Sequence, residues 1–176
     1  MEELLLNGTI HIAQLHGQEG EREIRRLREL TDHPLIQAFR IDTEQDVERA
    51  NASTADYVLL DSGAGGTGTV FDWDLLQAIR RPYFLAGGLD TENLGTVKAK
   101  LNPYGIDVSS GIETDGLKDK TKMAAFVAAV SCSITWSRSI PDTNPPYPLK
   151  LVFPRLPVPD TLAIHILLSI LCIASY

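Results

Sequence analysis

The stretch PYFLAGGLDTENLGTVKAKLNPYGIDVSSG, residues 82–111, decides the fold class. PYFLAGGL is an apolar run that ends in glycines, as a buried strand does before a turn, and GIDVSSG is a second run of this kind. Between them, TENLGTVKAKL is predicted to form a helix with Thr91 as its N-cap. A strand, a helix and a strand in this order predict a βαβ unit with two parallel strands.

The same alternation extends on both sides of this stretch. Three further strands are predicted at IHIAQLHG (10–17), PLIQAFRI (34–41) and DYVLLDS (56–62). Helices are predicted at EGEREIRRLRELT (19–31), TEQDVERANAS (43–53, with Thr43 as N-cap), FDWDLLQAI (71–79) and DKTKMAAFVAAV (119–130). Five strands that alternate with helices predict an α/β fold with a parallel sheet.

The composition narrows the class of protein. A net charge of −7 and a pI near 5.0 argue against a nucleic-acid surface, because phosphates need a basic stripe to neutralise them. The two cysteines are too few for a disulfide framework and lack metal-ligand spacing, so no metal site is predicted. The acidic start MEELLLNGT does not resemble a secretory signal, and a cytoplasmic location is the default.

The sequence changes character near Val130. All 13 glycines and most of the acidic residues precede it, whereas a proline-rich stretch and the apolar run LAIHILLSILCIAS follow it. We therefore predict a domain over residues 1–130 and a separate tail over 131–176. The apolar run is shorter than the ~20 residues that span a bilayer, so a membrane anchor is not expected. A packed segment and sequence foreign to the domain are the alternatives.

Polar residues follow the predicted strands where ligands of parallel α/β folds bind, beyond the carboxyl ends of the strands. These residues are Gln14, His16, Arg40, Asp61 and Asp107. Each has a structural alternative: Asp61 could open a turn, His16 could bond nearby backbone, and Arg40 could form an ion pair. The residues alone do not separate these readings from catalysis or substrate binding.

Two glycine-containing loops follow adjacent predicted strands. Gly87 and Gly88 leave backbone N–H groups uncovered after one strand, and Ser109, Ser110 and Gly111 do so after the next. Either loop alone could be an ordinary turn, but a pair of them predicts an anion site for a phosphate. GAGGTG, residues 63–68, lacks the spacing of a dinucleotide fingerprint, and we predict a lid there instead.

Four motifs together resemble one known family. They are QLHG at Gln14, LLDSGAGGTGTVFDW at Leu59, LAGGLDTENL at Leu85 and DVSSGIETDGLKD at Asp107. Their order and spacing, over roughly residues 4–130, are similar to those of phosphoribosylanthranilate isomerase, a (βα)8 barrel of tryptophan biosynthesis. The resemblance implies the last five βα units of that barrel, strands 4–8, followed by an unrelated tail. Its reaction would be an Amadori rearrangement of a small phosphorylated substrate, with no cofactor.

The resemblance also assigns roles to residues. Asp61 matches the general acid that protonates the ring oxygen, Asp107 matches an aspartate that lines the substrate, and Arg40 is expected to contact the substrate. The phosphate would bind at the backbone of Gly87, Gly88, Ser110 and Gly111.

One part of the family pattern is missing. The family begins with a strand ending in K-I-C-G, whose cysteine is the general base, and the present sequence contains no such motif. We therefore expect a chain without its first three βα units, inactive alone, with open sheet edges through which a partner could associate. The alternatives are a non-catalytic phosphate-binding or barrel-complementing module, a gene model faulty at both ends, and a different phosphate-binding barrel.

Overall fold

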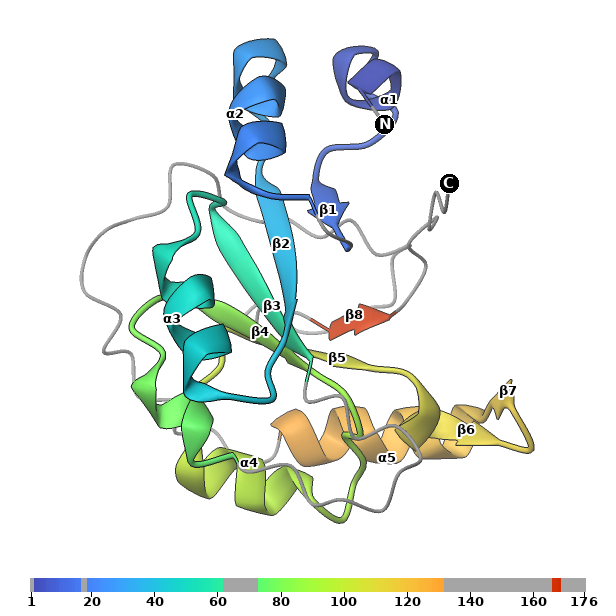
Figure 1. Ribbon diagram of the computed structural model, residues 1–176. Coiled ribbons are helices and arrows are strands. Elements are labelled where there is room, and N and C mark those ends of the chain that lie inside the picture. Colours follow the sequence, from blue (N-terminus) through green and yellow to red (C-terminus); the bar gives the residue numbers. More distant parts are fainter. Residues whose placement is uncertain (1, 17–18, 62–72, 132–165, 169–176) are drawn as a thin grey trace.

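The computed structural model describes residues 2–16, 19–61, 73–131 and 166–168, and the predicted lid at residues 63–68 lies outside them (Figure 1). The strands are β1 (Ala13–Leu15), β2 (Leu35–Arg40), β3 (Tyr57–Asp61), β4 (Tyr83–Ala86), β5 (Gly105–Val108), β6 (Glu113–Thr114), β7 (Leu117–Lys118) and β8 (Ile166–Leu168). The helices are α1 (Glu2–Leu6), α2 (Glu21–Leu30), α3 (Glu44–Ala52), α4 (Leu94–Lys100) and α5 (Lys120–Ser131), with the 3₁₀ turns η1 (Leu75–Ala78) and η2 (Ser110–Ile112).

A parallel sheet with the strand order β1-β2-β3-β4-β5-β8 forms the centre of the fold. The predicted α/β class and all five predicted parallel strands are confirmed. The sixth strand, β8, pairs with β5 and comes from the range predicted as a separate tail. The division of the chain near residue 130 stays a prediction.

Both faces of the sheet are buried, which explains why its strands are apolar at successive positions. Helices α3, α4 and α5 cover one face (Figure 1), where alternate strand residues such as Val58, Leu60 and Leu85 join their core. The intervening residues, including Leu59 and Phe84, form a second cluster on the opposite face. This alternation determines which polar residues at the strand ends share a face.

Four local features differ from the sequence prediction. The helix predicted over residues 71–79 is, in its described part, only the 3₁₀ turn η1. Thr91 does not cap α4: Asp90 accepts hydrogen bonds from the backbone N–H groups of Glu92 and Asn93, at 2.9 and 2.8 Å, and the helix begins only at Leu94. The short helix α1 was not predicted, because its consecutive leucines show no helical period. The antiparallel hairpin β6–β7 was also not predicted.

Thr43 caps α3 as predicted, through a capping box with Asp46. Partial burial disfavours the charged Asp46 carboxylate, but hydrogen bonds from the Thr43 hydroxyl and two backbone N–H groups, with the charge of Arg49, outweigh it and lower the pKa of Asp46. Because the pKa of Asp46 is lower in the folded state, the ionised carboxylate stabilises the fold at pH values above the ordinary pKa of 3.8. This stability is lost as the pH falls through the folded-state pKa.

We expect Thr43→Ala to reduce the free energy of unfolding by about 1 kcal/mol at pH 7, because it removes one half of this capping box. Urea unfolding followed by circular dichroism measures the change. Thr96→Ala, at an exposed position inside α4, is the matched control and should have a smaller effect. Equal losses in the two variants would contradict a specific role for the cap.

Candidate functional site

Four polar residues at the strand ends lie on the same face of the sheet. Side chains alternate along a strand, so Arg40 shares a face with Ile36, and Asp61 shares one with Leu59. Gln14 and Asp107 likewise alternate with residues that pack toward the helices. All four therefore belong to the face opposite the helix layer, and this face is where the sheet can present polar groups to a ligand.

The strand register brings three of the strand ends into line. Arg40 of β2 pairs with Asp61 of β3, and Asp61 pairs with Ala86 of β4. The backbone N–H of Ile41 also donates to the Asp61 carbonyl oxygen at 3.2 Å, which ties the exits of β2 and β3 together. Asp61 is half-buried at this rim, directly before the glycine-rich segment outside the described residues.

Arg40 forms an ion pair with Asp42 at the end of β2. Its Nε donates to Asp42 Oδ2 at 2.9 Å, and its side chain is 68% exposed. The ion-pair alternative for Arg40 is therefore observed, and it occupies one of the five N–H donors of the guanidinium. Asp107, in contrast, is half-buried within β5, and the exposed His16 directly follows β1.

The loop after β4 has a backbone that requires glycine. Gly87 and Gly88 have φ angles of 87° and 61°, in the left-handed region that side chains disfavour. Asn93 Nδ2 donates to the Gly88 carbonyl oxygen at 2.7 Å, and the Asp90 N–H donates to Asn93 Oδ1 at 3.1 Å. Asn93 therefore fixes the course of this loop from the turn that precedes α4.

The loop after β5 packs directly on the loop after β4. A Cβ atom added to Gly111 would overlap the Leu89 carbonyl oxygen and lie 2.9 Å from the Leu89 carbonyl carbon. Only a glycine lets the two backbones approach so closely. The two predicted anion-binding loops are thus side by side, at the rim where β4 and β5 end.

The hairpin β6–β7 brings one more charged group to this rim. Lys118 Nζ donates to the carbonyl and hydroxyl oxygens of Ser109, at 3.1 and 3.0 Å. The sequence analysis missed Lys118, although the dipeptide Asp115-Gly116 is a strong hairpin signal. Both residues have positive φ, 52° and 77°.

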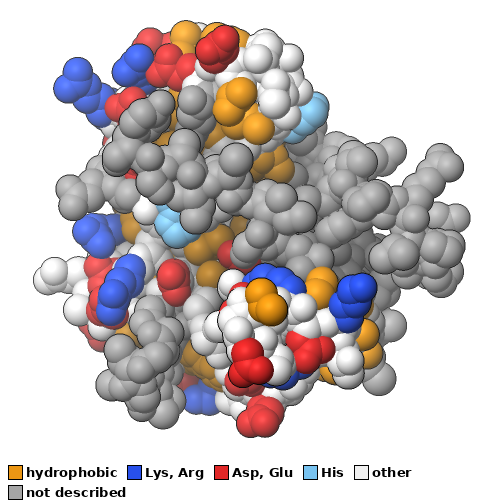
Figure 2. Space-filling model, turned by 90° about the vertical axis from the view of Figure 1, so that its right-hand side faces the viewer, with side chains coloured by type: hydrophobic (Ala, Val, Ile, Leu, Met, Phe, Trp, Pro, Cys, Tyr) orange, Lys and Arg blue, Asp and Glu red, His pale blue; other side chains and the backbone are white. Residues whose placement is uncertain are grey.

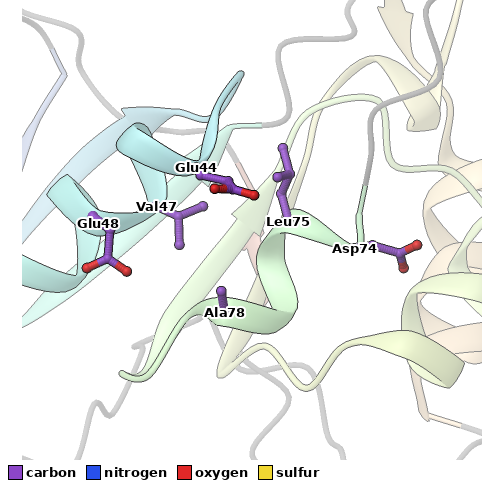
Figure 3. A pocket seen from close by; sticks show the side chains of 6 residues that line it. All are labelled: Glu44, Val47, Glu48, Asp74, Leu75 and Ala78. Atoms are coloured by element: carbon purple, nitrogen blue, oxygen red, sulfur yellow. The ribbon is translucent and has the colours of Figure 1, made fainter.

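A hollow also lies between α3 and η1 (Figure 3). Its lining carries three carboxylates among small and apolar side chains: Glu44, Val47, Glu48, Asp74, Leu75 and Ala78. None of the predicted site residues lines it. In the described parts of the chain, no group of three or more His, Cys, Asp or Glu side chains is placed to hold a metal ion. The helices described there are also too short or too polar to cross a membrane.

The family model of N-(5'-phosphoribosyl)anthranilate (PRA) isomerase matches residues 1–129. The chain belongs to this family. It is 45% identical over 123 residues to the phosphoribosylanthranilate isomerase of Endomicrobium trichonymphae, which covers 68% of this chain and 60% of that protein. The Bacillus cereus enzyme is 39% identical over 135 residues, which are 72% of this chain and 64% of that protein.

Solved phosphoribosylanthranilate isomerases share the fold. The Thermus thermophilus structure matches with a TM-score of 0.60 and 32% identity, over 74% of this chain and 65% of that one. The Pyrococcus furiosus structure matches with a TM-score of 0.59 and 30% identity, over 74% and 66%. The chain thus spans less than two thirds of the length of these relatives.

Proposed function

We propose that this chain carries the acid and the phosphate-binding loops of a phosphoribosylanthranilate isomerase. The reaction is the Amadori rearrangement of N-(5-phosphoribosyl)anthranilate to 1-(2-carboxyphenylamino)-1-deoxyribulose 5-phosphate in tryptophan biosynthesis. One observation carries the proposal. Asp61 and Asp107 lie on the same face of the sheet, and the two glycine loops that follow β4 and β5 contact each other. One solved family member, 28% identical, holds reduced 1-(o-carboxyphenylamino)-1-deoxyribulose 5-phosphate, a close relative of this product.

Asp61 would act as the general acid. Its proton goes to the furanose ring oxygen, the bond from C1′ to that oxygen breaks, and the nitrogen lone pair forms the Schiff base. A base then removes the proton from C2′, and the resulting enolamine tautomerises to the ketone. The product contains the same atoms and electrons as the substrate, so the enzyme's side chains have only to transfer protons.

The backbone amides of the two loops would hold the phosphate. Gly87 and Gly88 have positive φ, as residues of anion-binding loops often do, and η2 supplies the amides of Ser110 and Gly111. Concave sets of backbone N–H groups bind anions. Asp107 and Arg40 would contact the remainder of the substrate, Arg40 through guanidinium N–H groups other than the Nε–H that bonds Asp42.

The general base would come from a K-I-C-G strand. The sequence contains no such motif, and its two cysteines, Cys132 and Cys172, lie outside the described residues. We propose that β1–β5 correspond to strands 4–8 of the barrel and that this chain needs a base-bearing segment for turnover. Loss of one acid–base group typically costs 10²–10⁴-fold. For this biosynthetic role we propose a cytoplasmic location.

Complementation tests the proposal. The chain would be mixed with a fragment that carries the K-I-C-G strand and the first three βα units, and turnover of phosphoribosylanthranilate would be followed by fluorescence. We expect little activity from either part and measurable turnover from the mixture. A chain that turned over the substrate at full rate alone would show that its base is elsewhere.

A non-catalytic module is the second candidate, favoured by the position of β1 at the edge of the sheet. An edge strand presents unpaired backbone groups that another strand can join. This candidate predicts phosphate binding and a stable complex with the fragment, but no turnover. The same mixture, measured by size-exclusion chromatography and by assay, separates the two functions.

A further inference from the structure

The hairpin β6–β7 is held firmly at the rim of the sheet. Glu113 pairs with Lys118 across the two strands, and the turn between them has the positive φ angles that match the twist of a hairpin. Thr114 Oγ1 donates to Asp119 Oδ2 at 2.8 Å, while Asp119 Oδ1 accepts from the N–H of Thr121 at the start of α5. The hairpin is thereby fixed to α5 rather than projecting freely.

Because the hairpin is fixed to α5, Lys118 lies within hydrogen-bond distance of the loop after β5. Its ammonium group donates to the carbonyl oxygen of Ser109, to the Ser109 hydroxyl and to Glu113 Oε1, the last at 2.7 Å. The side chain is 40% exposed, so the charge is only partly screened by water. This side of the molecule carries acidic and basic side chains close together around the hairpin (Figure 2).

The bond to the Ser109 carbonyl has a consequence for the next residue. In a planar trans peptide the C=O of one residue and the N–H of the next point in opposite directions. The Ser109 oxygen also accepts from the Ile112 N–H at 3.3 Å. A cation that holds the same oxygen therefore helps to fix the direction of the Ser110 N–H. It also polarises the peptide, which makes that N–H a stronger hydrogen-bond donor.

We propose that Lys118 is a positioning residue of the phosphate site. It acts through the Ser109–Ser110 peptide, by orienting and polarising the Ser110 amide toward a phosphate dianion. Glu113 opposes this effect, because its carboxylate competes for the same ammonium group. The inference rests on the proposed phosphate site and adds to it a residue outside the two loops.

Phosphate titration of the full chain tests the inference. ¹⁵N-labelled protein at low ionic strength is titrated with inorganic phosphate, and the amide signals of Gly87, Gly88, Ser110 and Gly111 are followed. We expect Lys118→Met to weaken phosphate binding about three- to tenfold, because the Ser110 amide loses the cation that orients and polarises its peptide. In the free protein its Ser110 amide proton should move upfield, because the peptide is less polarised.

Three further variants distinguish positioning by charge from a structural role. Lys118→Arg should restore most of the affinity, and Glu113→Gln should strengthen binding about two- to threefold. Lys120→Met, which removes an exposed lysine two residues away, is the control and should bind as the wild type does. Thermal melts establish that each variant is folded.

The outcomes separate this inference from the proposed function. Normal phosphate binding by Lys118→Met, or no rescue by Lys118→Arg, would overturn the role of Lys118 and leave the phosphate site in place. Wild-type protein whose four loop amides do not respond to phosphate would overturn both. Weakening by Lys118→Met together with strengthening by Glu113→Gln supports the inference.

Discussion

Asp61→Asn is expected to lower kcat by about 10²–10⁴-fold in the chain complemented with a base-bearing fragment, because an amide cannot deliver the proton that opens the ring. Asparagine keeps the size and shape of the side chain at the half-buried end of β3. The affinity for phosphate should therefore change little, since the two glycine loops are untouched. A loss in kcat with phosphate binding preserved is the signature of a missing acid.

The measurement is steady-state turnover of phosphoribosylanthranilate, with phosphate affinity read separately from loop amide signals. Asp32→Asn is the matched control, because Asp32 is exposed and lies before β2, at the opposite end of the strands. It should leave kcat unchanged. A less than threefold effect of Asp61→Asn would assign the acid role to another group.

Gly111→Ala is expected to reduce the free energy of unfolding by about 1–3 kcal/mol, the usual cost of forcing a methyl group into a packed contact. The new Cβ would meet the backbone of Leu89, which cannot swing aside as a flexible side chain can. Either the loop after β4 or the loop after β5 must move. Phosphate affinity should fall at least tenfold, because the proposed site needs both loops in register.

Gly95→Ala is the control for this substitution. Gly95 is exposed in α4 and has no neighbouring atom within 4 Å of an added Cβ. Alanine should therefore stabilise the helix by about 0.5–1 kcal/mol, in the opposite direction to Gly111→Ala. Urea unfolding measures both changes. Wild-type stability in Gly111→Ala would show that the two loops separate easily.

The sequence predicted what depends on local periodicity. The buried runs before Asp61 and Asp107 predicted two strands, and the structure then placed both residues on one face of the sheet. The capping box of α3 was equally local, since Thr43 and Asp46 are three residues apart. The assigned roles of these residues in catalysis and binding stay predictions.

The sequence could not predict what depends on contacts between distant segments. The closeness of Gly111 to Leu89 requires the geometry of two loops at once. Asp115-Gly116 marks the turn of the hairpin, but its strands of two residues each are too short for any period, and nothing local shows that Lys118 reaches Ser109. Thr91 was predicted as the cap of α4, but the Asp90 carboxylate accepts from two N–H groups of the preceding turn, and the helix begins only after Asn93.

The order of the strands also bears on how the chain is made. Each strand from β1 to β4 lies beside the strand that follows it in the chain, and the paired residues are roughly 20–25 positions apart. Pairings at this separation have a lower contact order than pairings between the two ends of the chain, and domains begin to fold while the ribosome is still synthesising them. The sheet can therefore grow from its N-terminal edge one unit at a time during translation. Among the described strands, β5 waits longest for its second partner, because Ile106 pairs with Ile166 of β8.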